Sequence, residues 1–347
     1  MSLILPLAEW PEADADMWDA LQREGGPLDD RGRLVHLRAT SLETLQLRYG
    51  RWLQWLSDSE PETLAQSPAD RATPARLKAW LADLGHTAPM TRLMFVDGVL
   101  RVMRAVDPDR DWSVQMRLKA GLKRAAGRGD PARKAGRILS SGALLRAGRM
   151  LATEHVEAAS TRLQAMTRLR DGTMIAMLAL MPMRRRAFAG LTLGHSIHVD
   201  GEAILVSLPG ELTKTGVPWE AEVPAQVAPL LRRYLAESRP FFMTRGEERH
   251  DVLWVMERGC AFEENYLGQR IGGLTLKLTG KRVPPHFFRD AAATTLARVS
   301  PQSARLIRPI LAHSSFGTAE RHYIHARSIE AGRDYATVLA EKKRNLR

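Results

Sequence analysis

The spacing of apolar side chains predicts a helical domain in the first half of the chain. After Thr40 the apolar residues fall on one face of a helix: Leu42, Leu45, Tyr49, Trp52, Leu53 and Leu56. Thr40 has a glutamate three positions later, which is the arrangement of a capping box at a helix start. A second helix is predicted to begin at Thr73-Pro74, and two more follow before residue 123. We therefore expect a compact all-α domain over residues 37–123.

Two segments beside this domain lack a helical period. Residues 1–36 carry prolines, glycines and mixed charge, and we expect them to form an N-terminal arm. Residues 124–136 combine glycine and proline with closely spaced basic side chains, which repel one another and favour an extended basic linker. Such a linker is either a plain hinge or a segment that follows a phosphate backbone.

The pattern in the second half predicts helices around a small sheet. A long helix is expected over residues 161–181, and three strand-like runs follow at 196–199, 203–208 and 219–223. Turn residues separate these runs, which favours antiparallel pairing. Further helices are predicted at 226–237, 264–278, 286–298, 301–311 and 317–325. The expected fold class is mainly α with a small antiparallel β-sheet (α+β), and the second domain spans residues 137–327.

The C-terminal segment, residues 328–347, predicts one more helix with an apolar stripe and a basic end. It is a candidate for a contact between protomers. Packing of this helix against its own chain is the alternative.

The charge balance narrows the class of partner. The 51 basic residues exceed the 39 acidic ones and give a formal net charge of +12. An excess of this size favours a polyanion such as DNA, because neutralising phosphates releases condensed counterions. Cys260 is the single cysteine, so no intrachain disulfide can form. With no signal-peptide pattern and no membrane-span pattern, the sequence predicts a cytoplasmic protein.

The segment 284–326 carries candidate chemistry. His286 and Arg289 stand three positions apart, so they project from the same face of a helix. His313 follows at a predicted helix end, and Tyr323 lies ten residues later. Each residue alone is more often structural than catalytic, but the ordered combination is not typical of a structural pattern.

A His-x-x-Arg pair followed by a histidine and a tyrosine resembles the C-terminal signature of the tyrosine recombinases, the phage integrase family. Upstream, MPMRRRAFAGLTL resembles the first arginine motif of that family, with Arg184 at the arginine position and Leu191 at its leucine. LTKTG places Lys214 where the family has a lysine in a β-hairpin. The resemblance implies a helical core-binding domain, a catalytic domain, and six catalytic residues: Arg184, Lys214, His286, Arg289, His313 and Tyr323.

The resemblance also implies an activity, namely site-specific DNA cleavage and rejoining through a 3′-phosphotyrosyl intermediate with Tyr323 as the nucleophile. Neither a cofactor nor a metal nor ATP is expected, because the covalent bond conserves the phosphodiester energy. The partners expected are double-stranded DNA recombination sites, three further protomers in a tetramer on DNA, and accessory DNA-bending or directionality proteins. The expected setting is a mobile-element integrase associated with the nucleoid.

Several positions depart from the family pattern. Ala187 replaces an acidic residue three after the first arginine, Ala312 replaces a glycine, and Asp290 stands where histidine is common. The usual separation of nine after His313 would reach His322 rather than Tyr323, and Tyr335 is a second candidate nucleophile.

These departures leave alternatives open. One is a catalytically impaired relative that acts as an architectural or regulatory DNA-binding factor. Another is a type IB topoisomerase-like enzyme, which uses the same chemistry. A metal site formed by His313, His322 and His325 is a third reading, although no carboxylate set accompanies these histidines.

Overall fold

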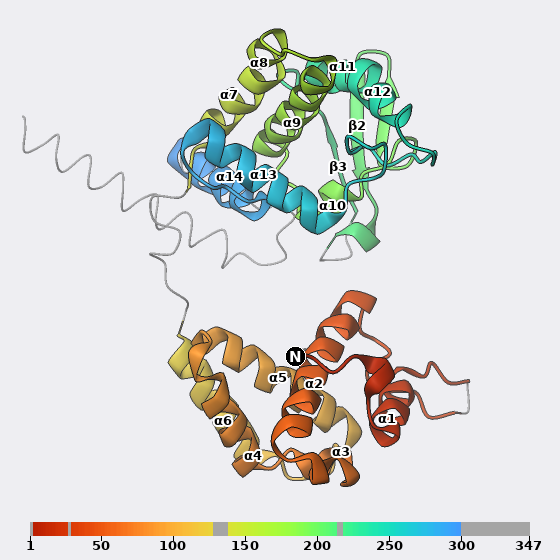
Figure 1. Cartoon of the computed structure of the whole chain (residues 1–347), viewed down its shortest axis with the longest axis vertical. Coiled ribbons are helices and arrows are strands. Elements are labelled where there is room, and N and C mark those ends of the chain that lie inside the picture. Colours follow the sequence, from red (N-terminus) through yellow and green to blue (C-terminus); the bar gives the residue numbers. More distant parts are fainter. Residues whose placement is uncertain (1–2, 27–28, 128–137, 214–217, 300–347) are drawn as a thin grey trace, which may run out of the picture. The chain divides into compact units, whose positions relative to one another are not determined.

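The structure is a computed structural model that describes residues 3–26, 29–127, 138–213 and 218–299, with side chains up to residue 296. Its contacts divide the chain into two units, 1–131 and 132–347, and each unit is described by itself below (Figure 1). Most of the predicted basic linker lies outside the described residues. No helix in these four ranges has the length and apolar character needed to cross a bilayer.

The first unit is built from helices. In chain order they are the 3-10 turn Leu7–Glu9, α1 (Glu12–Gln22), α2 (Ala39–Ser59), the 3-10 turn Pro61–Ala65, α3 (Pro68–Arg71), α4 (Pro74–Asp83), the 3-10 turn Leu84–His86, α5 (Pro89–Val106) and α6 (Ser113–Ala126). Thr73 caps α4 as predicted, because its side chain accepts from the backbone N–H of Arg76 at 3.2 Å. Thr40 does not act as a cap. Helix α2 begins one residue earlier and has Arg38 at its N-cap without a side-chain hydrogen bond.

Aromatic side chains dominate the core of this unit. Trp52 and Trp80 are fully buried and meet edge to face, with ring centroids 5.1 Å apart. Residues that contact this core include apolar side chains from α1, α2, α4 and α5. Each aromatic side chain buries a large apolar surface, so a few such residues are enough to hold the short helices together.

The segment before residue 37 is part of this core, and the expected N-terminal arm is wrong. Trp18 of α1 is buried with the aromatic cluster, and Asp14 and Arg71 form an ion pair at 2.6 Å with neither side chain exposed. The hydroxyl of Tyr49 donates to the same carboxylate at 2.6 Å. The prolines that suggested a loose segment instead precede the helical turns, since Pro11 is the N-cap of α1.

The second unit packs helices around a small sheet (Figure 1). Its elements are α7 (Ser141–Ala152), α8 (Glu154–Glu157), α9 (Arg162–Leu180), α10 (Arg185–Ala189), β1 (Ile197–Asp200), β2 (Ala203–Leu208), the 3-10 turn Gly210–Leu212, β3 (Trp219–Glu222), α11 (Ala228–Arg233), the π-helical turn Tyr234–Ser238, α12 (Arg239–Met243), α13 (Glu264–Thr279) and α14 (Pro285–Val299). The strands pair antiparallel in the order β1-β2-β3, and Val206 lies between Ile197 and Ala221. The predicted fold class is confirmed. The helices predicted after residue 300 lie outside the described residues.

Helix α9 forms the centre of the second unit and runs against α7. Two glycines permit the close approach of these helices. A Cβ atom at Gly148 would lie 2.6 Å from the backbone N of Ala176, and one at Gly172 would lie 2.5 Å from the backbone N of Ala152. Because nearly every side chain from Leu169 to Ala179 is buried, α9 provides a rigid support for the segment that follows it.

Candidate active site

Arg184 lies where the chain turns out of the core after α9. Met181, Pro182 and Met183 are buried, and the backbone N–H of Met183 donates to the carbonyl oxygen of Met181 at 2.7 Å. Arg184 is the N-cap residue of α10 and has an extended backbone. Burial lowers the pKa of its guanidinium below the ordinary value. A cation in this partly desolvated position interacts more strongly with an anionic ligand than a cation in bulk water does.

Arg289 projects from α14 towards the same turn. Its Nη1 donates to the carbonyl oxygen of Pro182 at 2.8 Å, two residues before Arg184. Burial and, to a smaller extent, repulsion from Arg184 lower the pKa of Arg289 to about 10, and the attraction of Asp290 offsets part of this decrease. The hydrogen bond to Pro182 places Arg289 beside the turn that carries Arg184, although the two arginines are far apart in the sequence. The structure therefore brings together two of the six predicted site residues.

His286 lies one helical turn before Arg289 on α14 and is exposed. Its ring meets that of Phe287 edge to face, with centroids 4.6 Å apart. Phe287 is itself buried in the core of the second unit. The structure thus places the exposed imidazole of His286 on the helix that carries Arg289.

Three of the predicted site residues, Lys214, His313 and Tyr323, lie outside the described residues. The alternatives Tyr335, His322 and His325 do so as well. In the sequence, position 214 falls between β2, which ends at Leu208, and β3, which begins at Trp219.

The pair of guanidiniums defines what this site can do. Arginine keeps its charge at neutral pH and presents N–H donors in a planar fork that matches the oxygens of a phosphate. Two such groups at one place, Arg184 and Arg289, can hold two oxygens of one phosphodiester and stabilise the negative charge that develops during its displacement. Among the described residues no group of three or more histidine, cysteine, aspartate or glutamate side chains could hold a metal ion.

Sequence reasoning missed a contact beside Arg184. Arg185, the second of three consecutive arginines at 184–186, forms an ion pair: its Nε donates to Oε1 of Glu264 on α13 at 2.9 Å. A Cβ atom at Gly268 would lie 2.8 Å from Cδ of Arg185, so glycine makes room for this side chain. Nothing in the local sequence around Glu264 indicates this partner, which depends on the tertiary packing of α10 on α13.

A buried charge network also escaped the sequence analysis. Arg170 is fully buried between the rings of Phe242 and Phe262, and its guanidinium donates to Asp171 at 2.7 Å and to Glu257 at 2.8 Å. Arg270 of α13 donates to the other oxygen of Asp171 at 2.6 Å. Burial lowers the pKa of Arg170, but the two carboxylates outweigh it and raise the pKa above the ordinary value. In the sequence, the only sign of this network was the adjacent pair Arg170-Asp171 within an otherwise apolar stretch. In the structure, the network attaches α13 to α9.

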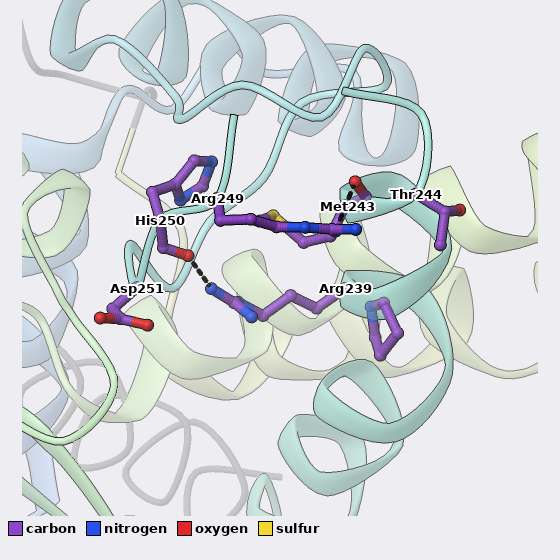
Figure 2. Close-up of a pocket in the computed structure, with 7 residues that line it drawn as sticks. Arg239, Met243, Thr244, Arg249, His250 and Asp251 are labelled. Carbon is purple, nitrogen blue, oxygen red and sulfur yellow. Dashed lines mark hydrogen bonds between the residues drawn. The ribbon is translucent and has the colours of Figure 1, made fainter. Parts of the chain in front are cut away.

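A hollow of about 460 Å³ lies between α12 and residues 249–251 (Figure 2). The side chains of Arg239 and Arg249 cross it in opposite directions (Figure 2). Both guanidiniums donate to backbone carbonyl oxygens: Nη2 of Arg239 to that of His250 at 2.7 Å, and Nη1 of Arg249 to that of Met243 at 3.1 Å. Neither Arg184, His286 nor Arg289, the predicted catalytic residues within the described ranges, lines this hollow.

The fold is that of the tyrosine recombinases. The chain is similar to XerH site-specific recombinase bound to palindromic difH substrate in a post-cleavage complex, with a TM-score of 0.57, 17% identity, and 84% of this chain and 79% of that chain covered. It is also similar to the Tn1549 transposon integrase in complex with circular intermediate DNA (TM-score 0.54, 14% identity, 91% and 98% covered). A lambda integrase dimer bound to a core site gives a TM-score of 0.51 at 12% identity, with 83% and 89% covered.

The chain belongs to the phage integrase family, whose model matches residues 149–329, just over half of the sequence. No curated protein sequence matches the chain. The family expected from the spaced arginine, histidine and tyrosine positions is confirmed, and the protein is a tyrosine recombinase.

Proposed function

We propose that the protein is a site-specific DNA recombinase that cleaves and rejoins strands through a 3′-phosphotyrosyl intermediate, with Tyr323 as the nucleophile. The observation that carries this proposal is the hydrogen bond from Arg289 to Pro182, which attaches the helix of one predicted catalytic arginine to the turn that carries the other, Arg184. Two adjacent, partly desolvated cations are costly without a ligand, and a phosphodiester supplies the missing negative charge. The similar XerH and Tn1549 integrase structures contain DNA, which supports this substrate class.

In the proposed cleavage step, the hydroxyl oxygen of Tyr323 forms a bond to phosphorus while the bond from phosphorus to the 5′ oxygen breaks. His286 accepts the phenol proton, and Lys214 donates a proton to the leaving 5′ oxygen. Arg184, Arg289 and His313 donate hydrogen bonds to the non-bridging oxygens. Attack of a 5′-hydroxyl from a partner strand reverses these events and restores a phosphodiester, so the chemistry requires neither ATP nor a metal ion.

The helical first unit is proposed to hold the DNA as a core-binding domain. Arg48 of α2 and Arg101 of α5 lie close enough for Arg101 to lower the pKa of Arg48, although burial of Arg48 is the larger cause. Asp97, which also forms an ion pair with Lys119, raises the pKa of Arg48 by more than Arg101 lowers it. A surface where arginines gather on two adjacent helices favours contact with a phosphate backbone.

The assembly and setting are likewise proposals. Exchange of strands between two duplexes requires four active sites, so we propose a tetramer on DNA, in which residues 328–347 supply a contact between protomers. We further propose a mobile-element integrase that associates with the nucleoid and works with accessory DNA-bending or directionality proteins. The likeness to a transposon integrase supports the mobile-element setting.

A covalent-trapping experiment tests this function. The native protein is incubated with a nicked duplex or a duplex with a bridging phosphorothiolate, and denaturing gels then detect a protein–DNA adduct. We expect an adduct with native protein and with Tyr335→Phe, and no adduct with Tyr323→Phe, which should still bind DNA in a gel-shift assay. An adduct that persists in Tyr323→Phe would overturn the nucleophile assignment. Sequence-specific binding by native protein that never yields an adduct would instead identify an architectural factor.

A further inference from the structure

The phage integrase pattern expects an acidic residue three positions after the first arginine, and this chain has Ala187 there. Ala187 is 2% exposed and packs in the core of the second unit, so no carboxylate reaches the site from that position. The orientation of Arg184 must therefore depend on other contacts of the segment that carries it.

That segment is short. Helix α10 spans only Arg185–Ala189, and a single turn of helix is unstable unless neighbouring elements hold it. The bond from Arg289 to Pro182 fixes the chain before Arg184. The ion pair between Arg185 and Glu264 fixes the chain directly after it, on the first turn of α13. Arg184 is thus held between two anchored neighbours.

The geometry of the second anchor is specific. Arg185 lies against α13 where Gly268 has no side chain, and it reaches Glu264 one helical turn away. Helix α13 is in turn attached to α9 through Arg270 and Asp171. A path of direct contacts therefore connects the central helix of the unit to the residue next to Arg184.

We infer that Glu264 and Arg185 are positioning residues for Arg184, and that this ion pair replaces the acidic residue missing at Ala187. The inference rests on the proposed function. Arg185 and Glu264 are 44% and 38% exposed, so the pair contributes little to global stability. Its effect falls on the placement of the Arg184 guanidinium, where a small displacement reduces the rate of strand cleavage.

Single-turnover cleavage of a nicked duplex tests this inference. At saturating DNA, we expect Glu264→Lys to lower the rate about fivefold or more. Glu264→Asp should stay close to native, and the exchange of both charges, Arg185→Glu with Glu264→Arg, should recover most of the rate. The matched control is Glu263→Lys, which makes the same change of charge one residue earlier, where no ion pair is present in the described structure.

Two further measurements separate positioning from other roles. DNA affinity by fluorescence anisotropy should change equally in Glu264→Lys and Glu263→Lys, and the melting temperatures of both should remain within about 2 °C of native. Equal cleavage rates for these two variants would overturn the inference. A defect confined to DNA affinity would also overturn it and would identify Arg185 and Glu264 as part of the DNA contact. The proposed function is judged separately, by whether native protein forms the adduct.

Discussion

The guanidinium of Arg289 donates to the carbonyl oxygen of Pro182 at 2.8 Å and so attaches helix α14 to the turn that carries Arg184. This bond links two motifs that lie far apart in the sequence. It also restricts the rotamers of Arg289, because one N–H of the guanidinium is tied to the backbone. Preorganised donors of this kind stabilise developing charge without a cost of reorganisation during the reaction.

Replacing Arg289 with lysine should therefore impair chemistry more than binding. Lysine keeps the charge but cannot hold both the Pro182 carbonyl and a phosphate oxygen in a planar fork. We expect the single-turnover cleavage rate to fall by roughly 10²-fold or more, with DNA affinity changed by less than about threefold. Arg186→Lys, on the exposed side of α10, is the matched control and should retain the native rate. A native rate in Arg289→Lys would show that positive charge suffices and the planar fork is not needed, whereas similar losses in both variants would show that the effect is not specific to Arg289.

The pKa of Arg289 predicts a dependence of stability on pH. Its value in the folded protein is about 10, below the ordinary value of an arginine in an unfolded chain. Well below pH 10 the guanidinium is protonated in both the folded and the unfolded protein, and its burial reduces the free energy of unfolding by the full desolvation penalty. Above pH 10 the unfolded protein binds more protons than the folded one, so this penalty is progressively relieved as the pH rises.

Arg289→Met removes the guanidinium. The difference in the free energy of unfolding between variant and native protein should therefore report the penalty of burying this charge. We expect the variant to gain stability relative to native at pH 8, and this advantage should shrink as the pH rises from about 9.5 to 11.5. Urea unfolding followed by circular dichroism at several pH values measures the difference. A difference that is independent of pH would show that Arg289 is not desolvated in the free protein.

The ion pair between Asp14 and Arg71 predicts that α1 is needed for the first unit to fold. Asp14→Ala leaves a fully buried guanidinium with carbonyl partners only and removes the acceptor of the Tyr49 hydroxyl. We expect a loss of about 3–5 kcal/mol in the free energy of unfolding of this unit. Tryptophan fluorescence reports mainly on the first unit, because six of the eight tryptophans precede residue 131. The exposed Asp16→Ala is the control and should change stability by less than about 0.5 kcal/mol.

The contact between α7 and α9 predicts that Gly172 tolerates no side chain. A methyl group there would lie 2.5 Å from backbone atoms of α7, so Gly172→Ala must separate the two helices. We expect a destabilisation of about 1–3 kcal/mol in thermal or urea unfolding of the second unit. Gly142→Ala is the comparison, since its Cβ would approach only the flexible end of Arg146 at 3.7 Å. That change should be neutral or slightly stabilising.

The elements with a strong local period could be predicted from the sequence. The strands at 197–200, 203–208 and 219–222 and the helix at 264–279 lie within a few residues of their predicted bounds. The pairing of Arg184 with Arg289 could be expected only through the family resemblance, because no local pattern connects residues so far apart. The carbonyl of Pro182 and the carboxylate of Glu264 could not be predicted, since both depend on how α10 lies against α13 and α14.

The N-terminal error has a physical cause. Prolines and glycines before residue 37 suggested a loop, whereas Trp10, Trp18 and Leu21 fill the space beside α2. A short helix between such residues has too few turns for its apolar period to be distinctive. The buried Asp14 looked like one charge among several in an acidic segment, and only its distant partner reveals its role.

The ion pair between the first helix and Arg71 has a consequence for synthesis of the chain. Asp14 leaves the ribosome well before its partner, which follows 57 residues later. Until Arg71 has emerged, the carboxylate of Asp14 has no counter-charge, and the tryptophan side chains packed near it stay exposed to solvent. The helical unit therefore cannot close before about half of it has been synthesised, and a nascent chain that pauses before residue 71 exposes an aromatic surface that chaperones would bind.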